Sequence, residues 1–283
     1  EQNRIPGMTN RTLARFASQV LQAFPGSWEE KLKPLTCGNP VRESVVNLGS
    51  PEQRYADREG PLRLLLTGGS QGALALNRLL PEAAGLLKDE VGIEVRHQAG
   101  PRWVEETTNS YRKAGIETGR SGFIRDHNKE NINPGRSGES RDQAEEKREE
   151  QEIAAFAAPT CSVEVTDFIE DMAAAYAWAD VVVCRAGALT VSEVAAAGVA
   201  ALFIPFPHAV DDHQTRNAEF LVENDAALLL QESQTDARTL ANALSSLAGD
   251  RARLASMAAR GRAVAVPDSA SRVAELCRGY VTS

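Results

Sequence analysis

Several features that would mark a membrane, metal-binding or secreted protein are missing from this 283-residue sequence. No apolar run approaches the roughly 18–20 residues that a membrane-spanning helix needs, and no secretory signal opens the chain. The cysteines are few and far apart, at Cys37, Cys161, Cys184 and Cys277. Their spacing indicates neither a metal site nor a redox pair, so we expect buried, reduced thiols in a cytosolic protein.

Positive charge is also scarce. The chain has 31 Lys and Arg against 39 Asp and Glu, which gives a formal net charge of −8 and a pI of about 5.2. An acidic chain argues against general nucleic-acid binding, so no nucleic-acid partner is predicted. Hydrophobic residues make up 42% of the sequence, which is enough for a large core, and the length fits one large or two small domains.

Strands and helices alternate from Pro61 onward. The continuous apolar run at 62–67 is typical of a strand that is buried on both faces of a parallel sheet. Alternation of this kind predicts an α/β fold with a doubly wound parallel sheet. Further strands are predicted within GIEVRHQ, CSVEVTDF, DVVVCR, ALFIPF and AALLL, and helices over 73–87, 102–114, 169–178, 189–198, 212–223, 237–247, 250–264 and 269–280.

Two segments depart from that alternation. Before Pro61 we expect only a helix over 10–17, a strand over 19–24 and then a connection. Later comes a long segment with almost no aliphatic residues, which ends in EEKREEQE. Because such a segment cannot bury enough apolar surface to offset its ordering entropy, it predicts a disordered insertion at about 117–159. A solvated helix over 142–155 is the alternative.

The glycine-rich stretch GGSQG directly follows the first buried strand and precedes a helix. In that geometry Gly68 and Gly69 let the backbone approach a phosphate, and Ser70 can add a hydroxyl donor. The P-loop pattern is absent, and the spacing differs from the G-x-G-x-x-G of dinucleotide-binding folds. A simple tight turn between strand and helix remains the alternative.

A second turn of the same kind lies in CRAGALTVSEVAAAG. Ala188, Leu189 and Thr190 would place N–H groups at a helix start, and Gly198 would end that helix. Glu193 could hold two neighbouring hydroxyls of a ribose, as an acidic residue does in dinucleotide-binding folds. The alternative for Glu193 is a favourable interaction with the helix dipole in the first turn.

A third polar stretch, PFPHAVDDHQTRNA, stands where a strand ends and a helix begins. Ligands of open α/β sheets bind at the carboxyl ends of strands. His208, Gln214 and Asn217 are therefore candidates for contacts to sugar hydroxyls, and Asp211 or Asp212 could instead cap the helix. Three such turns at one sheet edge favour a nucleotide-sugar site.

These motifs, together with TDFIEDMAAAYAWADVVVCRAG and the opening EQNRIPGMTNR, resemble the MurG family. Its members transfer N-acetylglucosamine to the undecaprenyl-pyrophosphoryl-MurNAc-pentapeptide lipid of peptidoglycan synthesis. The resemblance covers residues 1 to about 115 and from about 160 to the end. It implies the GT-B glycosyltransferase fold, in which two Rossmann-like halves face a cleft and the C-terminal half binds UDP-N-acetylglucosamine (UDP-GlcNAc).

The resemblance also implies roles for individual residues. Glu193 would hold the ribose, Gln214 the sugar hydroxyls and Ser70 the diphosphate. Ile169 would lie against the uracil, and Asn3 and Arg42 would reach the donor from the cleft and the hinge. The complete implied donor site is Asn3, Arg42, Ser70, Ile169, Ala188, Leu189, Thr190, Val191, Ser192, Glu193 and Gln214.

For the reaction, the resemblance implies an inverting transfer from lipid I to lipid II that uses no cofactor and no metal. The partners implied are UDP-GlcNAc, the undecaprenyl-linked acceptor and the cytoplasmic face of the inner membrane, where the protein would be peripheral. The general base belongs to the family's N-terminal half, so no catalytic residue is predicted. We do not assign His208 or His213 as the base, and we expect His97 at a strand edge and His127 in a loop.

The family also begins with a domain before EQN. Residues 1–36 are therefore predicted to be a remnant of the acceptor domain and 37–60 an interdomain linker. Residues 61–264 would form the donor domain and 265–283 a C-terminal helix. A truncated product that only binds the donor, another GT-B UDP-sugar transferase and a UDP-GlcNAc epimerase remain alternatives.

Overall fold

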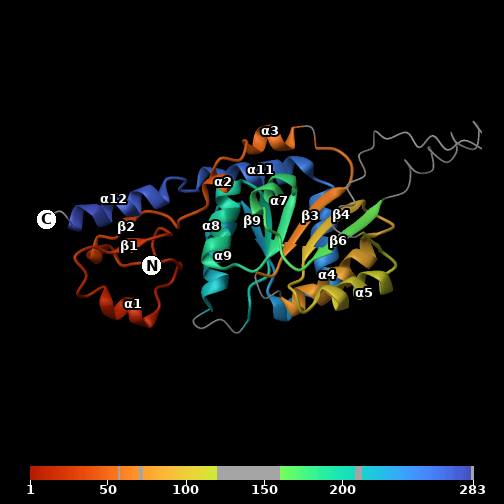
Figure 1. The fold of residues 1–283 in the computed structure, drawn as a ribbon, viewed down its shortest axis with the longest axis horizontal. Coiled ribbons are helices and arrows are strands. Elements are labelled where there is room, and N and C mark those ends of the chain that lie inside the picture. The colour runs from red at the N-terminus through yellow and green to blue at the C-terminus, as the bar shows by residue number, and fades with distance from the viewer. Residues whose placement is uncertain (57, 70–72, 120–159, 208–211, 282–283) are drawn as a thin grey trace, which may run out of the picture.

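A seven-stranded parallel sheet forms the centre of the molecule in the computed structural model, which describes residues 1–56, 58–69, 73–119, 160–207 and 212–281 (Figure 1). Its strand order is β5-β6-β4-β3-β7-β8-β9. The strands are β3 (Leu62–Thr67), β4 (Ile93–Gln98), β5 (Glu117–Gly119), β6 (Cys161–Thr166), β7 (Val181–Cys184), β8 (Ala200–Phe203) and β9 (Ala227–Leu229). The predicted doubly wound parallel α/β sheet is confirmed.

Helices cover both faces of this sheet. One core cluster joins the strands to α4 (Leu74–Leu87), α5 (Val104–Lys113), α10 (Ala237–Ala248) and α11 (Arg251–Ala263). The other joins them to α7 (Met172–Trp178), α8 (Ala188–Ala197) and α9 (His213–Val222). The predicted helix ends are correct to within about three residues, and Gly198 ends α8 in the left-handed conformation, as expected.

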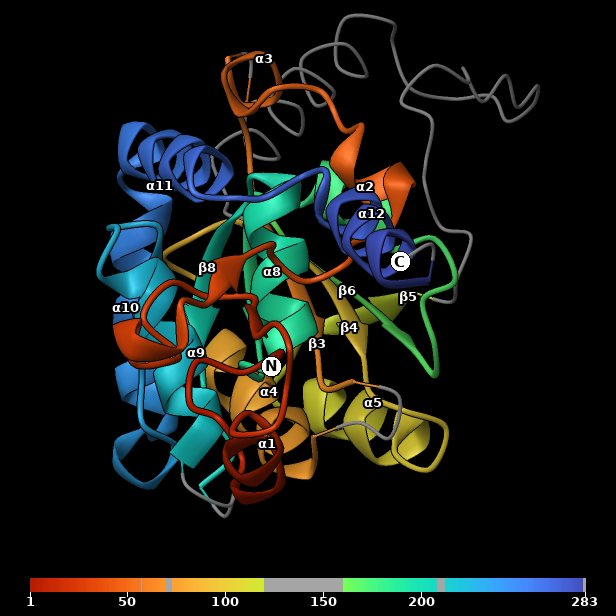
Figure 2. The same ribbon diagram turned by 90° about the vertical axis from the view of Figure 1, so that its left-hand side faces the viewer.

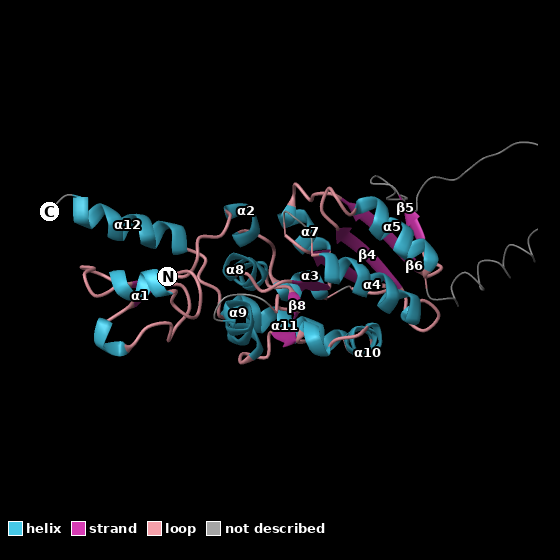
Figure 3. Cartoon of the chain, turned by 90° about the horizontal axis from the view of Figure 1, so that it is seen from below, coloured by secondary structure: helices cyan, strands magenta, loops and turns pink. Residues whose placement is uncertain are grey.

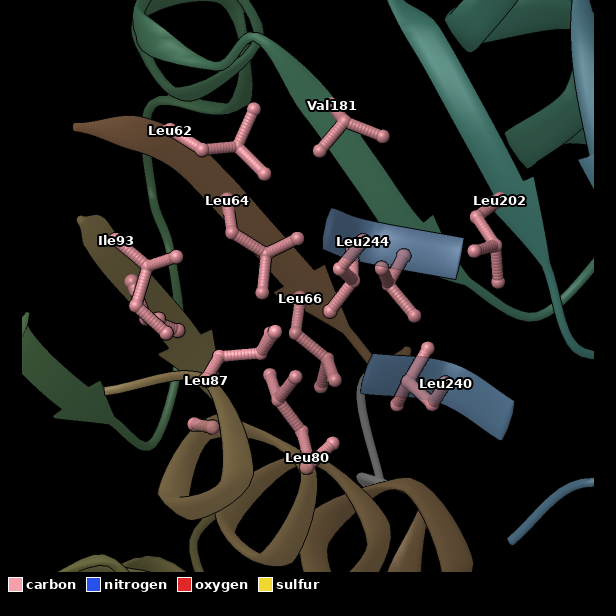
Figure 4. Packing of buried hydrophobic residues seen from close by; sticks show 14 of the residues in the cluster. Leu62, Leu64, Leu66, Leu80, Leu87, Ile93, Val181, Leu202, Leu240 and Leu244 are labelled. Atoms are coloured by element: carbon pink, nitrogen blue, oxygen red, sulfur yellow. The ribbon is translucent and has the colours of Figure 1, made fainter. Parts of the chain in front are cut away.

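Successive residues of a central strand pack into opposite core clusters, which explains why these strands are continuous apolar runs in the sequence. Leu64 and Leu66 point into the first cluster, which Figure 4 shows around Leu80 and Leu244, whereas Leu65 belongs to the second. All three leucines are at most 1% exposed. A strand covered on both faces needs apolar residues at every position, because neither face meets water.

Residues at the two chain ends form a smaller unit beside the sheet. It contains α1 (Met8–Leu13), a two-stranded parallel sheet of β1 (Leu21–Gln22) and β2 (Leu35–Thr36), a short 3-10 helix and α12 (Ser269–Val281). Figures 1 and 3 place α12 next to α1 and the small sheet, and Figure 2 views the molecule from that end. A cavity of about 620 Å³ separates β2 from α12.

Several predictions for the less regular segments were wrong. The first helix lies at Met8–Leu13, and the strand expected over 19–24 contains only two residues. The expected connection before Pro61 includes two short helices, α2 (Glu43–Val46) and α3 (Pro51–Tyr55). Residues 117–119, placed at the start of the insertion, form β5 and pair with β6; residues 120–159 lie outside the described part of the chain.

The four cysteines are free thiols, but they do not share one environment. Cys37 and Cys184 are buried as expected, Cys161 is partly buried, and Cys277 is exposed on α12, which corrects the prediction for that residue. Among the described residues, no helix is both long and apolar enough to cross a membrane. No group of three or more His, Cys, Asp and Glu side chains in the same residues is arranged to hold a metal ion.

Candidate functional site

Three helices begin at the carboxyl edge of the central strands. β3, β7 and β8 are neighbours in the sheet, and α4, α8 and α9 follow them in turn. Among the described residues, no side chain caps these helices, and no acidic residue stands in their first turns. By contrast, α5 carries Glu105 and Glu106 in its first turn. The starts of α4 and α8 therefore present N–H groups and positive dipole ends that suit an anion. The start of α9 suits an anion less well, because its N-cap residue is Asp212.

The glycine turn before α4 has the predicted geometry where it is described. Gly69 adopts φ +78°, a left-handed conformation that glycine reaches without strain, and a Cβ added there would meet open space. Glycine is therefore needed for the backbone shape and not for close packing. Ser70, predicted to touch a diphosphate, lies outside the described residues, so that contact stays a prediction.

Glu193 is an acidic group on α8 that two side chains hold by hydrogen bonds. Its Oε1 accepts hydrogen bonds from Nε and Nη2 of Arg42 at 3.2 and 3.0 Å, and its Oε2 accepts one from the hydroxyl of Tyr176 at 3.2 Å. The Glu193 side chain is 20% exposed, so part of it still meets solvent. The alternative role for Glu193 as a dipole partner in the first turn is wrong, because the residue lies beyond that turn.

Arg42 brings the segment before α2 to Glu193. It immediately precedes α2, and its side chain is 53% exposed. A half-exposed guanidinium remains hydrated and loses little when it changes partner. Arg42 and Glu193, 151 residues apart in sequence, are thus held together before any ligand is bound.

The other α8 residues of the predicted site divide into two groups. Ala188, Leu189 and Thr190 form the exposed or partly exposed first turn. Val191 is fully buried and its N–H donates to Gly187 O. The Ser192 hydroxyl donates to Ala188 O and accepts from the amide of Asn39. The structure therefore places Val191 and Ser192 behind the helix start, where they support it.

Asn3 belongs to a polar clasp between the N-terminal segment and α9. Its Oδ1 accepts a hydrogen bond from Asn217 Nδ2 at 3.0 Å, and Asn217 Oδ1 accepts one from Arg4 N at 2.9 Å. Asn217 is 1% exposed and also donates to Ala186 O. The prediction that Asn217 contacts a sugar is wrong, because its amide is buried and bonded within the chain.

The remaining predicted contacts lie in loops and helix starts around the same edge. Ile169, between β6 and α7, is partly buried against the second core cluster. Gln214, in the first turn of α9, accepts a hydrogen bond from Phe206 N at 3.0 Å. His208 lies outside the described residues, as does His127.

Sequence reasoning missed Arg185, which directly follows β7. Its Nη1 donates to Ile204 O and Pro205 O at 2.9 and 3.0 Å, and it pairs with Glu232. These bonds hold the residues directly after β8 next to the end of β7. The only available signal was a charged residue directly after the buried run DVVVC.

His97 corrects another expectation, because it is completely buried on β4, an interior strand. Nδ1 lies 2.9 Å from the hydroxyl of Tyr111, and Nε2 lies 2.9 Å from Asn77 Oδ1. Asn77 donates its Nδ2 to Ala99 O, so its Oδ1 accepts and the His97 proton belongs on Nε2. Burial lowers the pKa of His97 to about 3, and the ring is therefore neutral.

Comparison with known proteins finds a matching glycosyltransferase family and close sequence relatives. Residues 63–130 and 137–273 match the glycosyltransferase family 28 C-terminal domain. Two curated relatives are UDP-N-acetylglucosamine–N-acetylmuramyl-(pentapeptide) pyrophosphoryl-undecaprenol N-acetylglucosamine transferases. The one from Marinobacter nauticus is 41% identical over 277 residues, and the alignment covers 98% of this chain and 64% of the relative. The one from Ralstonia nicotianae is 46% identical over 282 residues, with 98% and 63% covered.

Solved structures agree with the sequence relatives. The crystal structure of Acinetobacter baumannii MurG is 34% identical with a TM-score of 0.76, and the match covers 99% of this chain and 65% of that one. A glycotransferase of kitacinnamycin, 18% identical with a TM-score of 0.51 over 92% of this chain and 55% of its own, supports the fold alone. The GT-B expectation and the resemblance to MurG are confirmed. The chain spans about 64% of the length of its curated relatives, and it belongs to glycosyltransferase family 28, whose C-terminal domain it contains.

Proposed function

We propose that this chain binds UDP-GlcNAc at the carboxyl edge of the sheet and supplies the donor half of a transferase. The whole activity would convert lipid I to lipid II in peptidoglycan synthesis. The observation that carries the proposal is the Glu193 carboxylate, oriented by two partners behind the uncapped start of α8. The names of relatives at 41–46% identity support the choice of substrates.

The diphosphate of the donor fits the starts of α8 and α4. N–H groups of Ala188, Leu189 and Thr190 would face one phosphate, and the Gly68–Gly69 turn would let the backbone approach the other. Ser70 would add a hydroxyl. Arg42 would supply a positive charge once it leaves Glu193. The backbone N–H groups at the start of α8 are fixed before the reaction, so they would stabilise negative charge as it grows on the leaving UDP.

The nucleoside and the sugar would occupy the flanks of that anion site. Glu193 would accept hydrogen bonds from the ribose hydroxyls, and backbone groups at Ile169 would meet the uracil. Gln214 would contact the hydroxyls of the N-acetylglucosamine. Asn3 would approach from the N-terminal segment, where its clasp with Asn217 holds it next to α9.

The chemical step would be an inverting displacement. The C4 hydroxyl of the acceptor sugar attacks the anomeric carbon, the bond from that carbon to the diphosphate oxygen breaks, and the hydroxyl proton passes to a base. We assign no described residue of this chain as that base. A lipid-linked acceptor implies work at the cytoplasmic face of the inner membrane as a peripheral protein, in the pathway that builds the cell wall during growth and division.

Isothermal calorimetry with UDP-GlcNAc tests the proposal, with UDP-glucose as the competing sugar nucleotide. We expect UDP-GlcNAc to bind more tightly than UDP-glucose. Failure of a cooperatively folded chain to bind UDP-GlcNAc would contradict the proposal. Transfer of labelled N-acetylglucosamine to a lipid I analogue then separates a transferase from a chain that only binds the donor.

A further inference from the structure

The hydroxyl of Tyr176 is a buried polar group at the edge of the proposed donor site. Tyr176 is 1% exposed, and its hydroxyl donates to Glu193 Oε2 at 3.2 Å. Burial, reinforced by the neighbouring Glu193 carboxylate, raises the pKa of Tyr176 well above 10. The phenol therefore stays protonated at physiological pH and acts as a fixed donor.

The backbone around Tyr176 is held at both ends of α7. Asp171 caps the first turn by accepting a hydrogen bond from Ala174 N at 2.9 Å. At the other end, Arg58 donates to the carbonyl oxygens of Ala177 and Trp178 at 2.6 Å each. The ring of Tyr176 packs within the same core cluster as Val191 and Val194 of α8. Its hydroxyl has little freedom to leave the carboxylate.

The two side chains bonded to Glu193, Arg42 and Tyr176, differ in how freely they can leave its carboxylate. Arg42 is the N-cap residue of α2 and its side chain is 53% exposed, so water can replace its contact with Glu193. Tyr176 is enclosed and has no comparable exchange with solvent. A carboxylate offers about four acceptor positions, and three of them are occupied by these two residues. Two incoming hydroxyls therefore require Arg42 to yield, while Tyr176 can remain.

We propose that Tyr176 is the positioning residue that holds the Glu193 carboxylate in the orientation that accepts the two hydroxyls of a ribose. Tyr176 touches no ligand itself and acts through Glu193. The inference rests on the proposed function, because it requires a nucleotide at this edge. Pre-orientation of the carboxylate lowers the loss of side-chain freedom on binding, which would otherwise weaken affinity.

The test is the substitution Tyr176→Phe, which keeps the ring and removes the hydroxyl. Calorimetry with UDP and with 2′,3′-dideoxy-UDP measures how strongly each protein prefers the ribose hydroxyls. We expect Tyr176→Phe to weaken UDP binding about five- to tenfold and to leave dideoxy-UDP binding unchanged. Weaker binding of both nucleotides by the same factor would show a merely structural role and would overturn the inference.

Tyr55 offers a matched control on the opposite side of the sheet. It is partly buried against the first core cluster and donates its hydroxyl to Asp180 O at 2.7 Å. Tyr55→Phe is expected to lower the melting temperature without changing the ratio of UDP to dideoxy-UDP affinity. A ratio that falls equally in both variants would contradict a specific role for Tyr176.

A double-mutant cycle with Glu193→Gln gives a second readout. If Tyr176 acts through Glu193, Tyr176→Phe has no further effect on UDP affinity in the Glu193→Gln background. Independent, additive losses would overturn the inference and leave the donor site standing. A wild-type chain that binds UDP and dideoxy-UDP equally would overturn the ribose contact of Glu193 and with it the role of Tyr176. A wild-type chain that binds neither nucleotide would overturn the proposed donor site as well.

Discussion

The two ends of the central sheet treat polar groups in opposite ways. At the amino end, charges and helix ends are bonded to one another inside the chain. At the carboxyl end, three helices start without caps in the described residues, and Glu193 is held by one buried and one half-exposed partner. Polar groups satisfied within a chain contribute to stability, whereas those that remain accessible can bind a ligand.

Asp180 is the centre of the amino end. It is 1% exposed, and its carboxylate accepts hydrogen bonds from Arg58, Arg251 and the backbone N–H of Arg63 at 2.8–2.9 Å. Nearby, the Arg54 guanidinium donates to carbonyl oxygens at the C-terminal end of α8. Cations at that end of a helix interact favourably with its dipole. This network ties α3 and the residues that follow it to the sheet.

The strongest way to break the comparison is to remove Asp180. Asp180→Ala leaves two arginines and a backbone N–H without their buried partner, and should lower the free energy of unfolding by about 3–5 kcal/mol. Urea denaturation measures this loss. Glu106→Ala, at an exposed pair with Arg78, is the control and should change stability by less than about 1 kcal/mol. Similar losses in both variants would contradict the assignment of Asp180.

At the other end, Glu193→Ala should act on binding more than on folding. Loss of two hydrogen bonds to a charged acceptor predicts about a 30-fold rise in the Kd for UDP-GlcNAc, or about 2 kcal/mol. Calorimetry gives the affinity, and thermal melting gives the stability. The exposed Glu43, next to Arg42 on α2, is the control position. An unchanged Kd for Glu193→Ala would remove the ribose contact from the proposal.

His97 lies near the carboxyl end of β4, but its ring nitrogens are bonded to other side chains of the protein and not open to a ligand. Its folded pKa of about 3 is below the ordinary value of 6.5, so the unfolded chain takes up the proton first as pH falls. The stabilising contribution is complete above pH 6.5 and decreases from there down to about pH 3. Unfolding free energies at pH 7.0 and 5.5 should differ by about 1 kcal/mol because of this group. His97→Asn should remove that difference, and an equal difference in both proteins would rule out His97 as its source.

The smallest effect is expected for Arg42. Because this side chain is half-exposed, Arg42→Ala should change the free energy of unfolding by less than about 1 kcal/mol. UDP-GlcNAc affinity should fall by about threefold, and that loss should shrink at high salt as the remaining charges are screened. A large loss of stability would show that Arg42 is a structural residue and not an exchangeable partner.

Local sequence patterns predicted most of the sheet but little of its polar pairing. The buried run 62–67 and the glycine stop at Gly198 were readable because each depends on neighbouring residues alone. The contacts of Glu193 with Arg42 and of Asn3 with Asn217 join residues 151 and 214 positions apart, and only the folded chain reveals them. The same holds for His97, whose alternating strand position gives no sign of its partners on α4 and α5.

The prediction for the short strand β5 was wrong for a different reason. Its three residues, Glu117–Gly119, have little strand propensity and gain their order from pairing with β6. Sequence composition therefore assigned them to the polar segment that follows. Asn217 was misjudged in a similar way, because an amide near a predicted site looks like a ligand contact until its burial is known.

NMR chemical-shift mapping of the isotope-labelled chain with UDP tests the contrast between the two sheet ends most directly. The account predicts that backbone shifts concentrate at Gly68–Gly69, Ile169 and the first turn of α8, while the surroundings of Asp180 at the amino end stay unchanged. Shifts centred on the amino end, or on the cavity between β2 and α12, would contradict the placement of the nucleotide at the carboxyl edge.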